Sequence, residues 1–425
     1  MTRSVASELM SRGHEVRLLT ANPNDQVLGD SDRFHEYDFH GMHVYCFEHD
    51  YVPMAGQTSV SELTYENRLA NDYFVRILEE FGPDVVHFFH LSRLGTGLIE
   101  KTVAAGVPAF MTPTDFWSVC PTSQLVLCNG YFCNGPSKYA GNCLKHSAAM
   151  SRKWMTRLIA RWTPGFIAEL ITGVSQFRGF PLGRRRDEVR AIISRLPTNV
   201  ARLNKLQGIF SPSQIMSDVL VRHGVSPRLI INSSYGISDT TRDAGISRCR
   251  PNLPLRFGFI GTLVHHKGCH LLIEAIRDIS PDQAVLKIYG RMEDYPQYSY
   301  NLELIANKQS SIQFCGTFPN SEIGDIFAGI DVLVVPSLWN ENTPLVIYSA
   351  QSACCPIIGS DYPGIAEVVQ HNVNGLLFEG GNVEALRRQI LRLVKEPDLA
   401  VQLGANAQMP KSIGGYVDEL LRYWG

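Results

Sequence analysis

Short apolar segments rich in β-branched residues alternate with amphipathic stretches along most of the sequence. In the first half, such segments predict strands at 15–20, 44–47, 84–89 and 108–112. In the second half the alternation restarts at residue 256 and continues to about residue 395. Strands that are apolar along their whole length, with helices between them, are typical of parallel sheets covered on both faces. The pattern therefore predicts an α/β protein.

The chain is long enough for more than one hydrophobic core. Its 425 residues exceed the usual size of a single domain. Between the two alternating halves, residues 232–254 are polar and contain Gly and Pro, which is typical of a linker. We expect one domain over 1–240 and a second over 241–405. The segment 406–425 ends in a predicted helix that returns to the first domain.

Composition excludes several classes of protein. With 44% hydrophobic residues, 19% charged residues and a net charge of -2, the chain is typical of a soluble globular protein and not of a nucleic-acid binder. No apolar run approaches the roughly 20 residues of a membrane span. The first 20 residues lack the apolar core of a signal peptide, and the ten cysteines are scattered. These features predict a cytoplasmic protein with reduced thiols.

Residues 151–205 interrupt the alternation with a basic stretch. Twelve Lys or Arg residues face only three acids there, for a local net charge of +9, and large apolar residues such as Trp154, Trp162 and Phe166 lie among them. This composition fits an insertion that lies on an anionic membrane surface. It fits equally well a pair of solvated helices over a core. The sequence leaves both interpretations open.

Two strand-to-helix turns in the second half carry residues suited to a phosphorylated ligand. A strand predicted at 256–261 ends at Gly261, and Lys267-Gly268 precede a helix. Glycine lets a ligand approach the backbone, and lysine brings a flexible charge to a phosphate. The spacing is not that of a P-loop, and an incidental surface lysine would leave the same pattern.

The second turn follows a strand predicted at 331–336. We expect an exposed loop over 339–342, with Thr343 as the N-cap of a helix and Pro344 at its first position. The free amides of such a helix start bind anions, and Glu341 would face the ligand. A third turn, at 359–367, contains Gly364. Because the carboxyl ends of parallel strands form the ligand edge of such sheets, these turns together predict a nucleoside-diphosphate site.

Three stretches of the second half carry a family resemblance. They are "GFIGTLVHHKGCHLLIEA", "VLVVPSLWNENTPLVIYSAQSACCPIIGSDYPGIAEVV" and "NGLLFEGGNVEAL", in that order. With them, residues 256–395 resemble the nucleotide-sugar domain of the family 4 retaining glycosyltransferases with a GT-B fold. The first half resembles the acceptor domain of the same family more weakly, through "SRGHEVRLLT", "PDVVHFFHL", "PTDFWSVCP" and "SPSQ".

The resemblance implies two Rossmann-like domains that face each other across a cleft. It implies transfer of a sugar from a nucleoside-diphosphate sugar to an acceptor, with retained configuration and without a divalent metal or other cofactor. Given the basic insertion, a lipid-linked or surface-polysaccharide acceptor is expected, reached from the cytoplasm or from the inner face of the membrane.

The resemblance also assigns residues. The catalytic candidates are Glu341 beside the transferred sugar, Lys267 on the donor diphosphate and Asp115 on the acceptor side. The remaining donor-site candidates are Gly261, Thr262, Gly268, Arg291, Asn342, Thr343, Pro344, Leu345, Ser349 and Gly364. The acceptor-side candidates are His87, His90, Thr114 and Trp117.

The chain departs from the family pattern at four places. Ser349 stands where a second glutamate usually holds the ribose, and Thr262 stands where a basic residue is frequent. Thr114 precedes Asp115 where many relatives have histidine. The family's opening strand and Gly-rich loop have no counterpart, so we expect the first domain to lack a central strand. The missing strand and Ser349 favour one alternative, a catalytically impaired binding or scaffold protein. A second alternative is a GT-B epimerase that acts on the nucleotide sugar alone, although the Lys267-Gly268 and 341–344 stretches fit transferases better.

One further cluster contains Cys120, Cys128, Cys133 and Cys143, with His146 nearby. The spacings lack the short CxxC pairs of most zinc sites, which favours reduced cysteines near the acceptor cleft over a metal site. We expect no metal.

Overall fold

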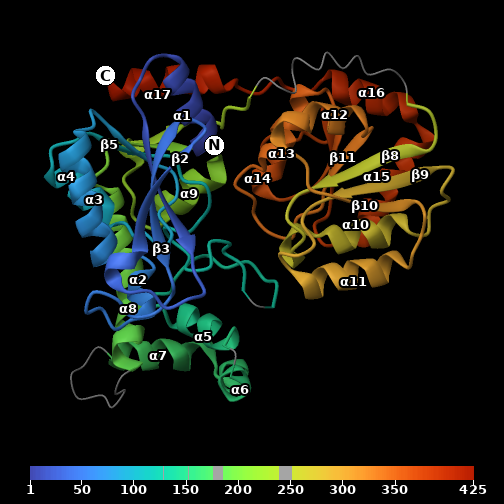
Figure 1. The fold of residues 1–425 in the computed structure, drawn as a ribbon. Helices are drawn as coiled ribbons and strands as arrows, with labels where there is room; N and C mark the ends of the chain where they lie inside the picture. The colour runs from blue at the N-terminus through green and yellow to red at the C-terminus, as the bar shows by residue number, and fades with distance from the viewer. Residues whose placement is uncertain (128, 152, 176–184, 239–250) are drawn as a thin grey trace.

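The computed structural model describes residues 1–127, 129–151, 153–175, 185–238 and 251–425. They form two α/β domains, one blue to green and one yellow to red in Figure 1. The predicted boundary between residues 240 and 241 lies outside the described residues.

The strands of the first domain form two sheets. In the first sheet, β1 (Arg17–Pro23) pairs in parallel with β3 (Met42–His49), and β2 (Phe34–Phe39) pairs with β3 in antiparallel. The second sheet is parallel, in the order β4 (Val86–Phe88), β5 (Ala109–Met111), β6 (Gly208–Ser211) and β7 (Ile230–Asn232). The β2–β3 hairpin was not predicted. Its two-residue turn places both His40 and Gly41 at positive φ, as a primed hairpin turn requires.

The two sheets are separated where a continuous Rossmann-like sheet would join them. β1 and β4 are edge strands, and cavities of about 470 and 460 Å³ lie between segments that contain them. Residues on both sides line the larger cavity, including Leu19 from β1 and Phe88 from β4. Among the described residues, no strand lies between β1 and β4. The two sheets are therefore separate in the part of the first domain that the structure describes.

Five helices surround these sheets: α1 (Thr2–Ser11), α2 (Val60–Leu63), α3 (Arg68–Phe81), α4 (Gly97–Ala104) and α9 (Gln214–Arg222). Helix α3 begins where the Asn67 side chain accepts a hydrogen bond from the amide of Ala70, and it ends at Gly82 in the left-handed conformation. In the described residues between β5 and β6 lie the helices α5 (Gly141–Ala149), α6 (Trp154–Trp162), α7 (Gly165–Ser175) and α8 (Arg185–Leu203). Figure 1 shows α5, α6 and α7 at the end of this domain remote from α1 and α17.

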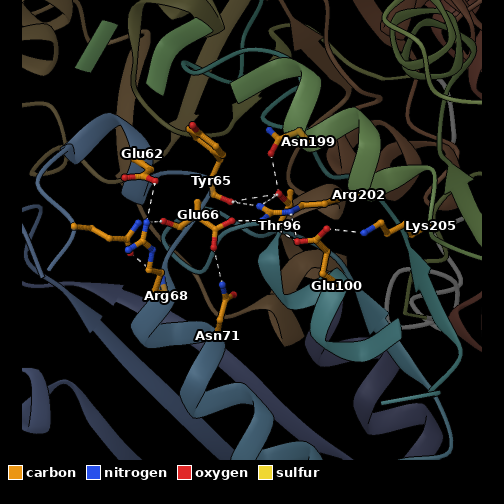
Figure 2. Close-up of polar contacts among 11 residues, drawn as sticks. Glu62, Tyr65, Glu66, Arg68, Asn71, Thr96, Glu100, Asn199, Arg202 and Lys205 are labelled. Atoms are coloured by element: carbon orange, nitrogen blue, oxygen red, sulfur yellow. Dashed lines mark hydrogen bonds and ion pairs between the residues drawn. The ribbon is translucent and has the colours of Figure 1, made fainter. Parts of the chain in front are cut away.

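Helix α8 is fastened to the domain by a buried arginine, as Figure 2 shows. Arg202 donates to Glu100 at 3.0 Å and to the Thr96 hydroxyl at 3.1 Å, and it forms an ion pair with Glu66. Arg195, which lies earlier in the same helix, is also buried. Two basic residues of the segment 151–205 therefore lie in the interior of the domain, and contact of this segment with a membrane stays a prediction.

The second domain contains one six-stranded parallel sheet, in the order β10-β9-β8-β11-β12-β13. Its strands are β8 (Leu255–Ile260), β9 (Ala284–Tyr289), β10 (Ile312–Gly316), β11 (Val332–Val335), β12 (Ile357–Ser360) and β13 (Gly375–Phe378). Its helices are α10 (Cys269–Ile276), α11 (Pro296–Ala306), α12 (Ile323–Ala328), α13 (Leu345–Ser352), α14 (Pro363–Ala366), α15 (Val383–Lys395) and α16 (Pro397–Ala405). The predicted α/β class with parallel sheets is confirmed.

The last helix, α17 (Ile413–Trp424), packs against α1 of the first domain. Tyr416 is fully buried there, and Arg12 of α1 pairs with Asp418 at 2.6 Å. Among the described residues, no helix has the length and apolarity that crossing a bilayer would need.

Candidate functional site

The turn after β8 and the turn after β11 meet at one edge of the second sheet. β8 and β11 are neighbours, with Val332 opposite Phe257. Lys267, from the first turn, donates to Glu341, from the second, at 2.6 Å. Ser337 donates to the same carboxylate oxygen, also at 2.6 Å. Glu341 is 3% exposed, whereas a quarter of the Lys267 side chain is exposed. Lys267 therefore forms an ion pair with a buried carboxylate while part of its own side chain remains in contact with solvent at the sheet edge.

Two glycines make this close approach possible. Gly268 has φ +71°, and a Cβ there would lie 1.9 Å from the carbonyl oxygen of Pro336. A Cβ on Gly364 would lie 1.6 Å from the carbonyl oxygen of Glu341. Any side chain at either position would force the turns apart. The three predicted turns therefore come together, and the contacts between them are made by backbone atoms at Gly268 and Gly364.

The predicted geometry of the loop at 339–342 was wrong. Trp339, Glu341 and Asn342 are buried, because the first domain covers the loop and Trp339 joins the hydrophobic core of that domain. The helix start was also misplaced. Pro344 is the N-cap of α13, and Thr343 precedes it at φ +46° without capping the helix. A left-handed conformation is rare for a β-branched residue and is a form of local strain typical of functional loops.

Asn342 links the two domains. Its side-chain oxygen accepts from the Ser213 hydroxyl at 2.7 Å, and its amide donates to the Tyr235 hydroxyl at 3.0 Å and to the carbonyl oxygen of Pro113 at 3.2 Å. All three partners belong to the first domain. One of them, Pro113, is two residues before Asp115 in the sequence. Asn342, predicted to contact the sugar donor, thus has its amide directed at the first domain.

A second link was missed by sequence reasoning. Glu367 accepts from the backbone amides of Gln214 at 2.7 Å and Ile215 at 2.9 Å, which are free donors at the start of α9. The "SPSQ" stretch marks Ser213 as a helix N-cap, so the exposed amides were readable from the sequence. Their partner, which is distant in the sequence, was not.

The acceptor-side candidates separate into two places. Asp115 accepts from the Trp117 amide at 2.7 Å and lies 3.0 Å from Nε2 of His90, with Thr114 half-buried beside it. His87 lies elsewhere, 2.8 Å from the Thr112 hydroxyl, and it packs against Trp424 of α17. Burial lowers the pKa of His87 to about 3, which keeps it neutral. The structure therefore brings His90 and Trp117, but not His87, to Asp115.

The remaining donor-side candidates border the same sheet edge. Thr262, after Gly261, is exposed, as is Arg291, which follows β9. Leu345 begins α13 with an exposed side chain, and Ser349 lies one turn further on the same face. The Ser349 hydroxyl donates only a long bond, 3.4 Å, to the Leu345 carbonyl oxygen. A ligand that reached this face would find that hydroxyl weakly engaged.

The cysteine cluster surrounds a cavity. Cys120, Cys133, Cys143 and His146 line a space of about 390 Å³, while Cys128 lies outside the described residues. Burial raises the pKa of Cys143 to about 12, so this thiol is protonated at neutral pH. In the described part of the chain, the side chains that bring three potential ligand atoms within 4.8 Å of one another are His35, Cys46 and Glu48, on β2 and β3.

Family models match both domains. The model described as "Glycosyl transferases group 1" matches residues 250–409, and the one described as "Glycosyl transferase 4-like domain" matches residues 1–163. The chain belongs to the group 1 glycosyltransferases. Its two α/β domains are those of the GT-B fold expected for this family.

Individual glycosyltransferases show the same likeness. The putative glycosyltransferase YtcC of Bacillus subtilis is 34% identical over 159 residues, which cover 35% of this chain and 39% of that protein. The amylovoran biosynthesis glycosyltransferase AmsK of Erwinia amylovora is 28% identical over 180 residues, 39% of this chain and 42% of AmsK. The matches thus span about two fifths of these relatives. Among solved structures, Anabaena Alr3699/HepE in complex with UDP and glucose has a TM-score of 0.59 at 15% identity, covering 96% of this chain and 99% of HepE. At that identity the likeness concerns the fold alone.

Proposed function

We propose that this group 1 glycosyltransferase transfers a sugar from a nucleoside-diphosphate sugar to a glycan or lipid-linked acceptor, with retained anomeric configuration. The observation that carries the proposal is the Lys267–Glu341 pair at the joined carboxyl ends of β8 and β11. A cation fixed at this edge, at the carboxyl ends of two parallel strands, suits a diphosphate. HepE, whose structure was solved in complex with UDP and glucose, supports the same class of donor.

In the proposed reaction the bond between the sugar C1 and the diphosphate breaks, and a bond from C1 to the acceptor oxygen forms. The proton of the acceptor hydroxyl passes to the departing diphosphate. Lys267 and the free amides at the start of α13 stabilise the charge that develops on the diphosphate. These groups replace a divalent metal in our proposal. Glu341, held by Ser337 and Lys267, positions the sugar. When the diphosphate arrives, Lys267 gains a second anionic partner.

The acceptor hydroxyl is proposed to come from the side of Asp115. This carboxylate and His90 form a polar pair on the first domain, and Pro113, two residues before Asp115, is bonded to Asn342, the residue after Glu341. The two half-sites are therefore adjacent across the domain junction. AmsK is named for the biosynthesis of a polysaccharide, which supports a surface-polysaccharide or lipid-linked acceptor. Such acceptors place the chain in the cytoplasm, at the inner face of the membrane.

The test is turnover with a panel of UDP-, GDP- and dTDP-sugars, with the anomeric configuration of the product determined by NMR. We expect transfer with retention, and loss of transfer in Glu341→Ala. A donor that binds but is neither transferred nor hydrolysed would overturn the proposal in favour of a binding or scaffold protein. Ser349, in place of the family's second glutamate, is the residue that favours this alternative. Isomerisation of the donor sugar without an acceptor would overturn it in favour of an epimerase.

A further inference from the structure

Helix α6 is built with its apolar side outward. With about 3.6 residues per turn, its large apolar residues share one side of the helix. These residues are Trp154, Met155, Leu158, Ile159 and Trp162, and all five are exposed, Trp162 to 77%. Ala160, on the opposite side, is the buried residue of the helix. A helix that packs on a globular core has the reverse arrangement.

Helix α7 repeats this inversion. It buries the small residues Ala168, Thr172 and Ser175. It exposes Phe166 to 74% and also exposes Ile167, Leu170 and Ile171. Counting Met150, which precedes α6, ten of the 26 exposed large hydrophobic side chains in the described part of the chain fall between residues 150 and 171. Scattered apolar side chains on a surface need no explanation, but a concentration of this size in one pair of helices marks an interaction surface.

The charges around this apolar face have one sign. Arg157 and Arg161 are exposed on α6, and Lys153, which immediately precedes the helix, is exposed as well. The single acid of α6 and α7, Glu169, accepts hydrogen bonds from the amides of Tyr139 and Gly141. Asp187 and Glu188 of α8 likewise bond inward to the segment around α2. The face therefore offers cations without competing acids among the described residues.

The support of this face is firm. Glu169 ties α7 to the segment that precedes α5, and α5 packs against both α6 and α7. Helix α8 continues from this region into the Arg202 network of the first domain (Figure 2). The helices therefore present the apolar face as part of the domain and not as a loose arm.

We propose that the face formed by α6 and α7 docks the protein on an anionic lipid bilayer. We name it the α6–α7 face. Large aromatic and aliphatic side chains interleaved with Lys and Arg, on helices of nine and eleven residues, are suited to lie in the interface and not to cross the membrane. The absence of acids on the face favours a negatively charged lipid surface over a second copy of this chain, whose same face would repel it. The bilayer docking is a property of this face and does not require that the chain transfer sugar.

The experiment is flotation of the full chain with vesicles of phosphatidylcholine alone or with 30 mol% phosphatidylglycerol, without nucleotide or acceptor. We expect binding to the anionic vesicles and little to the neutral ones. Replacement of Lys153, Arg157 and Arg161 by Gln should weaken the partition about 100-fold, at about fivefold per charge, and raised salt should act similarly. The double variant Trp162→Ser with Phe166→Ser should abolish binding, and it should fold normally because both side chains are exposed.

The matched control is Tyr300→Ser with Leu304→Ser, which removes two exposed apolar side chains from α11 of the second domain and should leave binding unchanged. Vesicles with brominated acyl chains should quench Trp154 and Trp162, so quenching should fall in Trp154→Phe with Trp162→Phe while binding persists. The proposal is overturned if the chain ignores anionic vesicles, or if the Ser variants bind as well as the parent. It is also overturned if the lipid-free chain dimerises and these variants are monomeric. Because no nucleotide is present, donor-site failure cannot produce any of these results.

Discussion

Replacing Asn342 with alanine should loosen the domain junction without unfolding either domain. The substitution removes three hydrogen bonds, from Ser213 and to Tyr235 and Pro113. Two of these groups keep another partner: the Ser213 hydroxyl still accepts from the Met216 amide, and Tyr235 still donates to Pro113. Because few groups are left unsatisfied, we take the lower part of the usual range, about 1–2 kcal/mol in total.

Hydrogen exchange offers a local readout of this change. The amides of Gln214 and Ile215 are bonded to Glu367 across the junction, so their exchange reports separation of the domains. A loss of about 1–2 kcal/mol should speed their exchange about 5- to 30-fold, if exchange follows the opening equilibrium.

The control is Asn204→Ala, which removes hydrogen bonds made within the first domain, to Gly224 and Ser226. It should leave the exchange of these two amides unchanged. Unaltered exchange in Asn342→Ala, with both domains folded, would refute the view that Asn342 joins the domains.

Three further predictions concern stability and the donor site. Arg202→Met should lower the urea stability of the first domain by about 2–4 kcal/mol. Arg68→Met, at an exposed arginine that lies 3.9 Å from its partner Glu62, should change it by less than about 0.5 kcal/mol (Figure 2), and equal effects would contradict the role given to Arg202. Burial lowers the pKa of His87 to about 3 and of His270 to about 4, so the unfolded chain binds more protons than the folded chain below pH 6.5. Stability should therefore fall as the pH drops from 6.5 to 5, with a shallower fall in His87→Gln, and a flat profile would contradict this assignment. Ser349→Glu should leave donor binding intact or tighten it, as measured by calorimetry, and loss of binding would show that the pocket is built for another ligand.

The sequence was sufficient for the fold class and for the convergence of the three turns, because both follow from local patterns. The apolar segments predict the strands, and the glycines at 268 and 364 indicate where the backbone turns and where two turns come close to each other. The burial of Trp339 and Asn342 could not be read in the same way, because it depends on the other domain, whose contact surface is assembled from distant segments. The loop is polar enough to be exposed, and only docking against Ser213 and Tyr235 covers it.

The same limit explains two other outcomes. His87 and His90 are three residues apart, and the sequence cannot say which of them faces Asp115. His87 lies in β4, whereas His90 lies in the loop after that strand, and α17, from the far end of the chain, packs against His87. In the basic insertion, the sequence gives the number of charges correctly, but not their direction. Arg195 and Arg202 of α8 point inward, where they donate to the carbonyl oxygens of Trp117 and Tyr65. Composition gives the number of charged residues in a segment, but it does not show which of them form buried hydrogen bonds in the domain interior.

Equilibrium binding of nucleoside diphosphates to Lys267 variants tests the central claim most directly. Titration calorimetry would compare the parent chain with Lys267→Met and Lys267→Arg, using UDP, GDP and dTDP, with Lys395→Met as a surface control on the same domain. One charge-assisted contact to phosphate predicts about tenfold weaker binding or more in Lys267→Met, partial recovery in Lys267→Arg and no change in the control. If Lys267→Met, with an unchanged unfolding midpoint, binds all three ligands as the parent chain does, or if the parent binds none of them, the turns at the edge of the second sheet are not a nucleoside-diphosphate site.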